Sequence, residues 1–151
     1  MLTGVKVGDA MTEKPVTVPS TLRIDKCAQL MAENHVGSLL VGEDGKVVGM
    51  FTERDIVRKI VAKGVQPWSV HAKDVMETKL VTIRPDEDVF EALRTMADYN
   101  IRHLVVKNAD GKFVGFITGK DILKIQPQLF EILSEKIELR EMERKRRRFS
   151  R

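Results

Sequence analysis

Apolar and polar positions follow the same order twice along the chain. In each half, apolar residues first recur at i, i+3, i+4 and i+7, the spacing of a helix with one buried face. Two short, mostly apolar runs separated by a turn come next, which is typical of antiparallel strands. The helical stripes are Ile24, Cys27, Ala28 and Met31 in the first half and Val89, Ala92, Leu93 and Met96 in the second.

Each half also opens with a short extended stretch and closes with a second helix, so the pattern predicts the order β-α-β-β-α. A threonine at the end of the last strand, Thr52 or Thr118, is a good N-cap for that closing helix. The expected strands are 15–18, 38–41 and 47–51 in the first half and 80–83, 103–106 and 113–117 in the second.

The two halves also match letter by letter. The segment that starts at Gly45 reads GKVVGMFTERDI, and GKFVGFITGKDI starts at Gly111. Upstream, DAMTEKPVTV from Asp9 corresponds to DVMETKLVTI from Asp74. A repeat of this length means two copies of one folding unit packed together, followed by a tail. The predicted parts are repeat 1 at 1–66, repeat 2 at 67–126 and a C-terminal amphipathic helix with a basic end at 127–151.

Composition indicates an ordinary globular protein. The chain of 151 residues is 42% hydrophobic and 32% charged, and no apolar run approaches the roughly 20 residues that span a bilayer. The first residues lack the regions of a signal peptide, and one cysteine excludes an internal disulfide. We therefore expect a cytoplasmic protein without a membrane partner. Trp68, in the short segment between the repeats, is expected to pack at their junction.

The repeated polar residues have two interpretations. Thr52 and Asp55 recur as Thr118 and Asp121. A threonine N-cap with an acidic residue three positions later is the geometry of a capping box. The same placement, at a strand end beside a helix start, also suits an anion, and a carboxylate there can accept hydrogen bonds from a ribose diol. The spacing alone leaves both interpretations open.

The repeat resembles a cystathionine-β-synthase (CBS) domain, and the pair resembles a Bateman module. GMFTERDI and GFITGKDI fit the Gly-x-x-Thr/Ser-x-x-Asp signature of that family, and the DAMT and DVME openings with PVTV and LVTI also match. The resemblance covers about residues 7–125. It implies an α+β fold of two β-α-β-β-α repeats related by pseudo-twofold symmetry, with clefts between them that commonly bind AMP, ADP, ATP or S-adenosylmethionine.

The resemblance also implies roles for individual residues. The signature aspartates would bind ribose hydroxyls, the threonines would bind ribose or phosphate, and backbone beside the first strand would recognise adenine. Carried onto this chain, the nucleotide-binding residues are Asp55 and Asp121, Thr52 and Thr118, Val16 and Thr17, and Val81 and Thr82.

The repeats differ where family members often place phosphate-binding cations. Gly37 and Ser38 in repeat 1 correspond to Arg102 and His103 in repeat 2. Arg102 offers a planar, permanently charged group suited to phosphate. His103 is either a titratable phosphate ligand or a half-buried strand residue with a satisfied ring. The remaining candidates, which could equally be solvated charges at a helix start, are Arg54 and Lys120.

No catalytic or metal-binding pattern stands out. His35 and His71 have no partner at metal-ligand spacing. Cys27 aligns with an alanine on a core-facing stripe, so we expect an inert, buried thiol. We therefore predict neither an enzyme nor a protein-built metal site, and no required cofactor.

The tail carries most of the net charge of +4, because residues 126–151 hold eight Lys/Arg and five Glu. Three interpretations compete for it: a solvated helix end, an oligomerisation helix, and a weak, salt-sensitive contact with nucleic acid. The apolar positions that would pack are Leu129, Ile132, Leu133, Ile137 and Leu139.

These inferences favour a regulatory sensor of adenine nucleotides. It would bind its ligand in clefts between the repeats, form a homodimer, and signal occupancy to a regulated protein partner by a population shift. The alternative is a nucleic-acid-associated factor that uses the basic tail, with the CBS pair as its regulatory or structural body.

Overall fold

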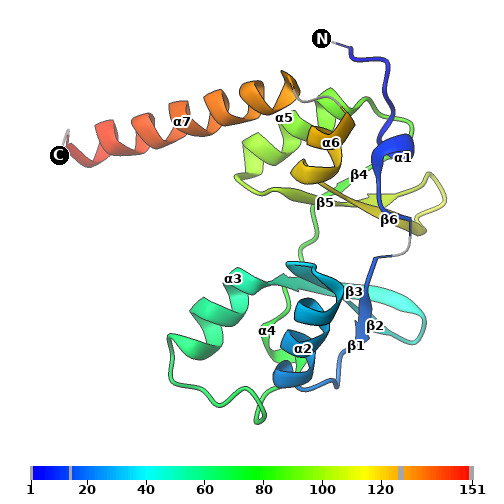
Figure 1. The fold of residues 1–151 in the computed structure, drawn as a ribbon, viewed down its shortest axis with the longest axis vertical. Coiled ribbons are helices and arrows are strands. Elements are labelled where there is room, and N and C mark those ends of the chain that lie inside the picture. The colour runs from blue at the N-terminus through cyan, green and yellow to red at the C-terminus, as the bar shows by residue number, and fades with distance from the viewer. Residues whose placement is uncertain (1, 14, 126–127, 150–151) are drawn as a thin grey trace. The chain divides into compact units, whose positions relative to one another are not determined.

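The computed structural model describes residues 2–13, 15–125 and 128–149, with the backbone alone at 128–134, 136, 137 and 149. The chain divides into two compact units, Pro15–Leu80 and Met1–Lys14 with Val81–Arg151. Each unit contains a three-stranded sheet with helices on one face (Figure 1). The predicted α+β fold of two similar repeats, with a helix at the C-terminal end, is confirmed.

The unit Pro15–Leu80 has the strand order β1-β2-β3. The first pair is parallel and the second antiparallel, since a helix connects the first two strands and a tight turn connects the last two. Its strands are β1 (Thr17–Pro19), β2 (Ser38–Glu43) and β3 (Lys46–Thr52), and its helices are α2 (Ile24–Asn34), α3 (Glu53–Asp55) with the π-helical η1 (Ile56–Val61), and α4 (Ala72–Val75).

The other unit repeats this plan with the order β4-β5-β6 and the same parallel and antiparallel pairings. Its long C-terminal helix packs against two helices of the same unit, α5 and α6. The strands are β4 (Thr82–Ile83), β5 (His103–Lys107) and β6 (Phe113–Thr118), and the helices are α1 (Val7–Ala10), α5 (Val89–Tyr99), α6 (Gly119–Ile125) and α7 (Gln128–Phe149).

Each unit has its own hydrophobic core between its sheet and its helices. The predicted helical stripes supply buried residues in both, because one face of each amphipathic helix leaves water. In the first unit the core includes Ile24, Cys27, Met31, Leu39, Val41 and Phe51; in the second it includes Val89, Ala92, Leu93, Met96, Leu104, Val106 and Ile117.

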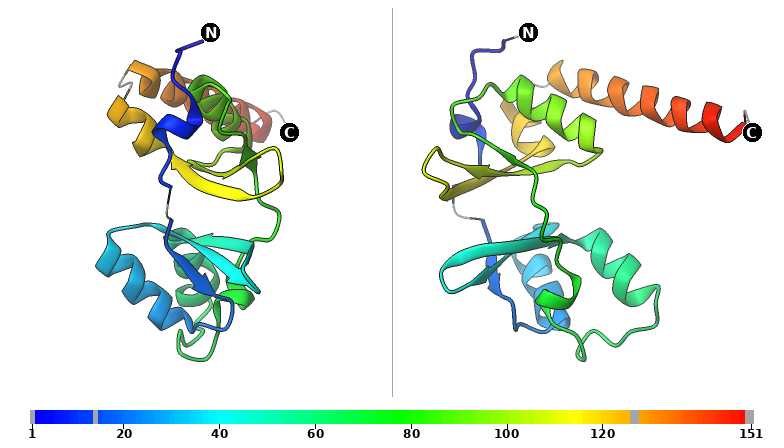
Figure 2. Two further views of the ribbon diagram at one scale, coloured as in Figure 1. Left: turned by 90° about the vertical axis from the view of Figure 1, so that its right-hand side faces the viewer. Right: turned by 180° about the vertical axis from the view of Figure 1, so that it is seen from behind.

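The segments that precede each first strand belong to the unit of the other repeat. Residues 1–14 lie with repeat 2, and residues up to Leu80 lie with repeat 1. Figure 2 shows the N-terminal segment beside the unit of β4, β5 and β6. Thr12 pairs with Phe116, and Glu77 pairs with Met50 in the equivalent place. The boundaries of the sequence repeats therefore differ from the boundaries of the compact units.

Two exposed regions complete the description. Trp68 is 58% exposed, so its predicted burial is wrong; its loop is held by backbone bonds such as the one from the Ser69 N–H to the Gln66 carbonyl. On α7, Leu139 is 55% exposed and the basic residues 144–148 are exposed. None of the described helices is both long and apolar enough to cross a membrane. The other predicted apolar positions of the tail, Leu129, Ile132, Leu133 and Ile137, lie outside the described side chains.

Candidate functional site

The sequence-predicted polar residues meet at one end of each sheet. Thr52 is the last residue of β3 and lies directly opposite Ser38, the first residue of β2. In the second unit Thr118 ends β6 and lies opposite His103, which begins β5. Since the first strand of each sheet runs parallel to the second, its start lies at the same end.

These residues also share a face of their sheet. Side chains alternate between the two faces along a strand, and residues paired in register share a face. Leu39 and Phe51 are paired and buried in the core of their unit, so Ser38 and Thr52 lie on the opposite face. The same rule places all six predicted strand residues on the face opposite the core: Thr17, Ser38, Thr52, Thr82, His103 and Thr118.

A capping box joins Thr52 to Asp55. The Thr52 N–H donates to Asp55 Oδ2 at 2.9 Å, and the Thr52 hydroxyl lies 3.4 Å from the same oxygen. This arrangement satisfies backbone donors at the start of the closing helix and fixes the carboxylate beside the strand end. The structural interpretation of the pair is therefore confirmed.

Thr118 and Asp121 repeat this arrangement. The Thr118 N–H donates to Asp121 Oδ2 at 2.9 Å, and the Asp121 N–H donates to the Thr118 hydroxyl at 3.2 Å. Both aspartates are half-buried. In each aspartate, Oδ2 accepts the capping hydrogen bond from the threonine N–H. The second carboxylate oxygen, Oδ1, has its own acceptor sites. Capping and ligand binding are thus compatible in one side chain.

The two aspartates differ in their cationic surroundings. Lys59 Nζ lies 3.4 Å from Asp55 Oδ1 and donates to the Val75 carbonyl at 3.0 Å. The position equivalent to Lys59 in repeat 2 is Ile125, so repeat 2 has no cation at that position. Comparison of the two repeats in the sequence did not single out Lys59. The signal was present there, because the aligned residue of repeat 2 is an isoleucine.

The first strand of each sheet supplies backbone at the same end. The Val16 carbonyl accepts from the Leu40 N–H at 3.0 Å, and the Val81 carbonyl accepts from the Val105 N–H at 3.2 Å. β1 and β4 are edge strands, so one side of each lacks a strand partner within its own sheet. Backbone groups on that side suit recognition of a planar, hydrogen-bonding ring.

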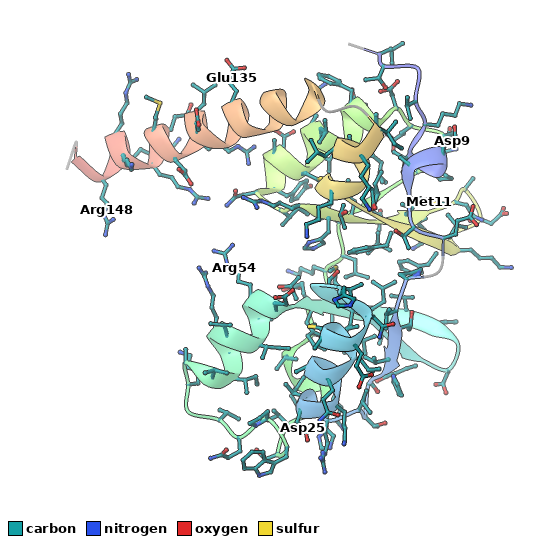
Figure 3. The ribbon with its side chains drawn as sticks, in the orientation of Figure 1. Asp9, Met11, Asp25, Arg54, Glu135 and Arg148 are labelled. Carbon is teal, nitrogen blue, oxygen red and sulfur yellow. The ribbon has the colours of Figure 1, made fainter. Side chains whose placement is uncertain are left out.

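The remaining predicted residues occupy different environments. The His103 ring stacks on Phe116, with centroids 5.8 Å apart and planes inclined by 17°, so its orientation is fixed by an aromatic neighbour on the same face. Arg102 is exposed. Arg54 and Lys120, which precede the aspartates, are also exposed. In Figure 3 the Arg54 side chain extends away from the helix that carries it.

Sequence comparison missed an acidic residue at the site of repeat 1. The Glu53 N–H donates to the Gly37 carbonyl at 2.9 Å, and a Cβ placed on Gly37 would lie 2.6 Å from Glu53 Oε1. The Glu53 carboxylate therefore lies across the bare backbone of Gly37. The equivalent of Glu53 in repeat 2 is Gly119, a difference that the aligned motifs already contained.

The glycine of the signature has a packing role. A Cβ at Gly49 would lie 2.6 Å from the sulfur of Met76 and 3.0 Å from the Glu77 carbonyl oxygen. At Gly115 it would lie 2.6 Å from the sulfur of Met11. The methionine of each DAMT or DVME opening thus passes directly over the signature glycine, which explains why these distant motif parts occur together.

Metal binding and thiol reactivity are two other kinds of chemistry, each with structural requirements of its own. Among the described residues, no three His, Cys, Asp or Glu side chains lie together as a metal site would require. Cys27 is buried in the core of its unit, and burial raises the pKa of its thiol to about 11. Such a thiol is unreactive at neutral pH because the nucleophile is the thiolate.

Comparison with known proteins gives consistent matches. The family model described as CBS domain matches residues 7–62 and 72–127. The protein MK0525 of Methanopyrus kandleri is 34% identical over 88% of this chain and 68% of its own length.

Two solved structures of similar chains contain adenosyl compounds. The CBS domain protein PAE2072 of Pyrobaculum aerophilum, complexed with AMP, has a TM-score of 0.74 and 27% identity, over 86% of this chain and 99% of that one. The CBS domain pair of protein MJ0100, in complex with 5′-methylthioadenosine and S-adenosylmethionine, has a TM-score of 0.71 and 26% identity, over 80% and 98%.

Proposed function

The chain belongs to the CBS-domain family, and we propose that it is a regulatory module that binds an adenosyl ligand at the polar end of each sheet. Its two family-model matches together span most of the chain. Related domain pairs hold AMP or 5′-methylthioadenosine with S-adenosylmethionine. AMP, ADP, ATP and S-adenosylmethionine are the candidate ligands.

The observation that carries this proposal is the duplicated arrangement of threonine and aspartate. In both units an aspartate uses Oδ2 to cap a helix and stands beside a threonine on the sheet face opposite the core. We assign Oδ1 of Asp55 and Asp121 to ribose hydroxyls, because an ionised carboxylate accepts strong hydrogen bonds from a diol. Asp55 Oδ1 would share this role with its contact to Lys59, since one carboxylate oxygen can accept more than one hydrogen bond. The hydroxyls of Thr52 and Thr118 would contact ribose or phosphate.

The other predicted residues complete each cradle, by which we mean the polar sheet end of one repeat. Backbone around Val16 and Thr17, or around Val81 and Thr82, would recognise adenine. The ligand would act by binding one conformation of the protein more tightly than another, which shifts the population that a partner protein recognises. No bond in the ligand has to break for this mechanism.

Calorimetric titration tests the proposal directly. AMP, ADP, ATP, S-adenosylmethionine and NAD would each be titrated into the wild-type chain, Asp55→Ala and Asp121→Ala. Loss of a charged hydrogen-bond acceptor should weaken the affected site by about 1.5–3 kcal/mol, or roughly 10- to 150-fold. We expect at least one adenosyl compound to bind, and each substitution to remove or weaken one site.

A matched control separates ligand binding from helix capping. Asp74 forms the same capping box with His71, whose N–H donates to Asp74 Oδ2 at 2.8 Å, but it lies outside the cradles. Asp74→Ala should lower stability to a similar degree and leave ligand affinity unchanged. If no adenosyl compound binds the wild type, or if both cradle variants bind like the wild type, the proposed function is wrong.

A further inference from the structure

Both cradles contain an equivalent backbone hydrogen bond, but the side chains of the two bonded residues differ in charge between the repeats. In repeat 1 the Glu53 N–H donates to the Gly37 carbonyl at 2.9 Å. In repeat 2 the Gly119 N–H donates to the Arg102 carbonyl at 3.0 Å. In repeat 1 the donor residue is therefore a glutamate and the acceptor residue is a glycine. In repeat 2 the donor residue is a glycine and the acceptor residue is an arginine.

The position of the acidic group in repeat 1 depends on the missing side chain of Gly37. Glu53 Oε1 and Cδ would lie 2.6 and 3.5 Å from a Cβ at that position. Glu53 directly follows Thr52, and Gly37 directly precedes Ser38, which is paired with Thr52. The carboxylate is therefore held at the sheet end that carries the cradle.

The cations that follow the threonines do not distinguish the repeats, because Arg54 and Lys120 occupy equivalent positions and are both exposed. Asp55 and Asp121 are also equivalent. The unmatched charges directly next to the threonine pairs are the Glu53 carboxylate and the Arg102 guanidinium. Lys59 of repeat 1 is also unmatched, but it lies 3.4 Å from Asp55 Oδ1 and donates to the Val75 carbonyl. The cradle of repeat 2 is therefore more positive than the cradle of repeat 1.

Adenosyl ligands differ mainly at the 5′ carbon of the ribose. In AMP, ADP and ATP it carries a phosphate, in 5′-methylthioadenosine a neutral thioether, and in S-adenosylmethionine a cationic sulfonium. If an aspartate holds the ribose diol in the same way in both cradles, the 5′ group is what meets the unmatched charge. Its charge should then decide which cradle it prefers.

We infer that Glu53, positioned over Gly37, makes the cradle of repeat 1 selective for adenosyl ligands with a neutral or cationic 5′ group. The contrast is with the cradle of repeat 2, where the family resemblance already implies a phosphate-binding role for Arg102. This inference rests on the proposed function. It names Glu53 as a specificity-determining residue and gives one chain two sites of different ligand class.

The expected effect is moderate because both groups are accessible to water. At separations of about 6–8 Å and an effective dielectric constant between those of protein surface and water, one unit charge changes the affinity for an anion by about three- to tenfold. The effect should weaken as ionic strength rises, since exposed charges are screened over about 10 Å.

The test compares AMP with 5′-methylthioadenosine, which share adenine and ribose but differ in 5′ charge. Each cradle is isolated by disabling the other aspartate. In the Asp121→Ala background, Glu53→Gln should raise AMP affinity about three- to tenfold and leave 5′-methylthioadenosine affinity within about twofold. In the Asp55→Ala background, Arg102→Gln should lower AMP affinity by a similar factor with the same lack of effect on the thioether.

Glu43→Gln provides the matched control. Glu43 is an exposed residue at the far end of β2 from the cradle, so removing its charge should change neither affinity. Circular dichroism of every variant would verify that the fold is retained.

The outcomes separate the inference from the proposed function. If ligands bind and the aspartate variants behave as proposed, but Glu53→Gln and Arg102→Gln shift AMP and 5′-methylthioadenosine equally or shift neither, the charge selection is wrong and the proposed function stands. If neither compound binds the wild-type chain, both are overturned. A preference that grows at high salt would also contradict the inference.

Discussion

The carbonyl oxygen of Thr12 lies 2.8 Å from the point that a Cβ atom on Gly115 would occupy. The N-terminal segment and β6 pass this closely because Thr12 and Phe116 exchange two backbone hydrogen bonds, of 2.8 and 3.0 Å. The N-terminal segment is thereby attached to β6 of repeat 2. The signature position is therefore glycine because the backbone of the N-terminal segment leaves no room there for a Cβ atom.

Gly115→Ala should destabilise the protein by about 1–3 kcal/mol, the usual cost of forcing an extra methyl group into a packed site. The Cβ would meet the Met11 sulfur, which can move, at 2.6 Å, and the Thr12 carbonyl oxygen, which is backbone and cannot rotate away, at 2.8 Å. Gly49→Ala should cost less, because its methionine contact is equally short, 2.6 Å to the Met76 sulfur, but its backbone contact, to the Glu77 carbonyl oxygen, is longer at 3.0 Å. Urea denaturation followed by circular dichroism would measure both.

Gly42→Ala is the control for these substitutions. A Cβ there would meet Thr17 Cγ2 at 3.4 Å and the Lys46 carbonyl oxygen at 3.6 Å, which are ordinary contacts. Its stability should stay closest to the wild type. An order of stability in which Gly115→Ala is the mildest of the three would contradict the packing role of the signature glycine.

Asp88 makes stability depend on acidic pH. Its Oδ2 accepts from the Thr3 and Gly4 N–H groups at 2.9 and 3.0 Å, and its Oδ1 accepts from the Phe90 N–H at 2.9 Å. Burial acts to raise the pKa of this carboxyl, but the hydrogen bonds from Phe90, Thr3 and Gly4 outweigh it, so the pKa of Asp88 is lowered. The stabilisation is present above the unfolded-state pKa, about 3.9, and is lost as pH falls through the lower folded pKa.

Asp88→Asn should therefore lower the free energy of unfolding by about 1–2 kcal/mol at pH 7, where the carboxylate is ionised. The difference from the wild type should shrink as pH falls below about 4. Asp86→Asn is the control: Asp86 pairs with Arg84 at 3.2 Å on the exposed surface, and such pairs contribute about 1 kcal/mol or less. A pH-independent deficit in Asp88→Asn would refute the linkage.

The Cys27 thiol should be unreactive in the native protein. Burial raises its pKa to about 11, so almost none of it is thiolate at pH 8. Reaction with an aromatic disulfide reagent should be slow in buffer and rapid in denaturant. Cys27→Ala should keep adenosyl binding, since repeat 2 has Ala92 at the equivalent place. Rapid labelling without denaturant would mean that the core of this unit opens readily.

Deleting residues 140–151 should leave adenosyl affinity within about twofold of the wild type, because none of the proposed cradle residues lies there. The deletion removes an exposed ion pair between Arg140 and Asp98, 3.1 Å apart, worth about 1 kcal/mol or less. If the basic tail binds nucleic acid, the deletion should abolish a salt-dependent affinity for RNA or DNA, measured by fluorescence anisotropy at two ionic strengths. A large loss of adenosyl affinity would contradict the proposed placement of the cradles.

Local features of the chain were readable from the sequence alone. The period of about 65 residues, the helical stripes and the strand pairs predicted two β-α-β-β-α units, because amphipathic spacing and turn residues act over a few positions. The pairing of Thr52 with Asp55, and of Thr118 with Asp121, was also local, since a capping box spans three residues.

Only the tertiary structure decided which distant segments of the chain complete each unit. Repetition shows that two segments are alike, but it does not show which unit each segment completes. Residues 1–14 lie with repeat 2, although they stand before repeat 1 in the sequence. Likewise, the Glu53 carboxylate lies over Gly37 because a backbone bond joins residues sixteen positions apart. Packing and electrostatics act through space. The sequence therefore determined the two cradles and their threonines and aspartates, and the folded chain determined which charges stand beside them.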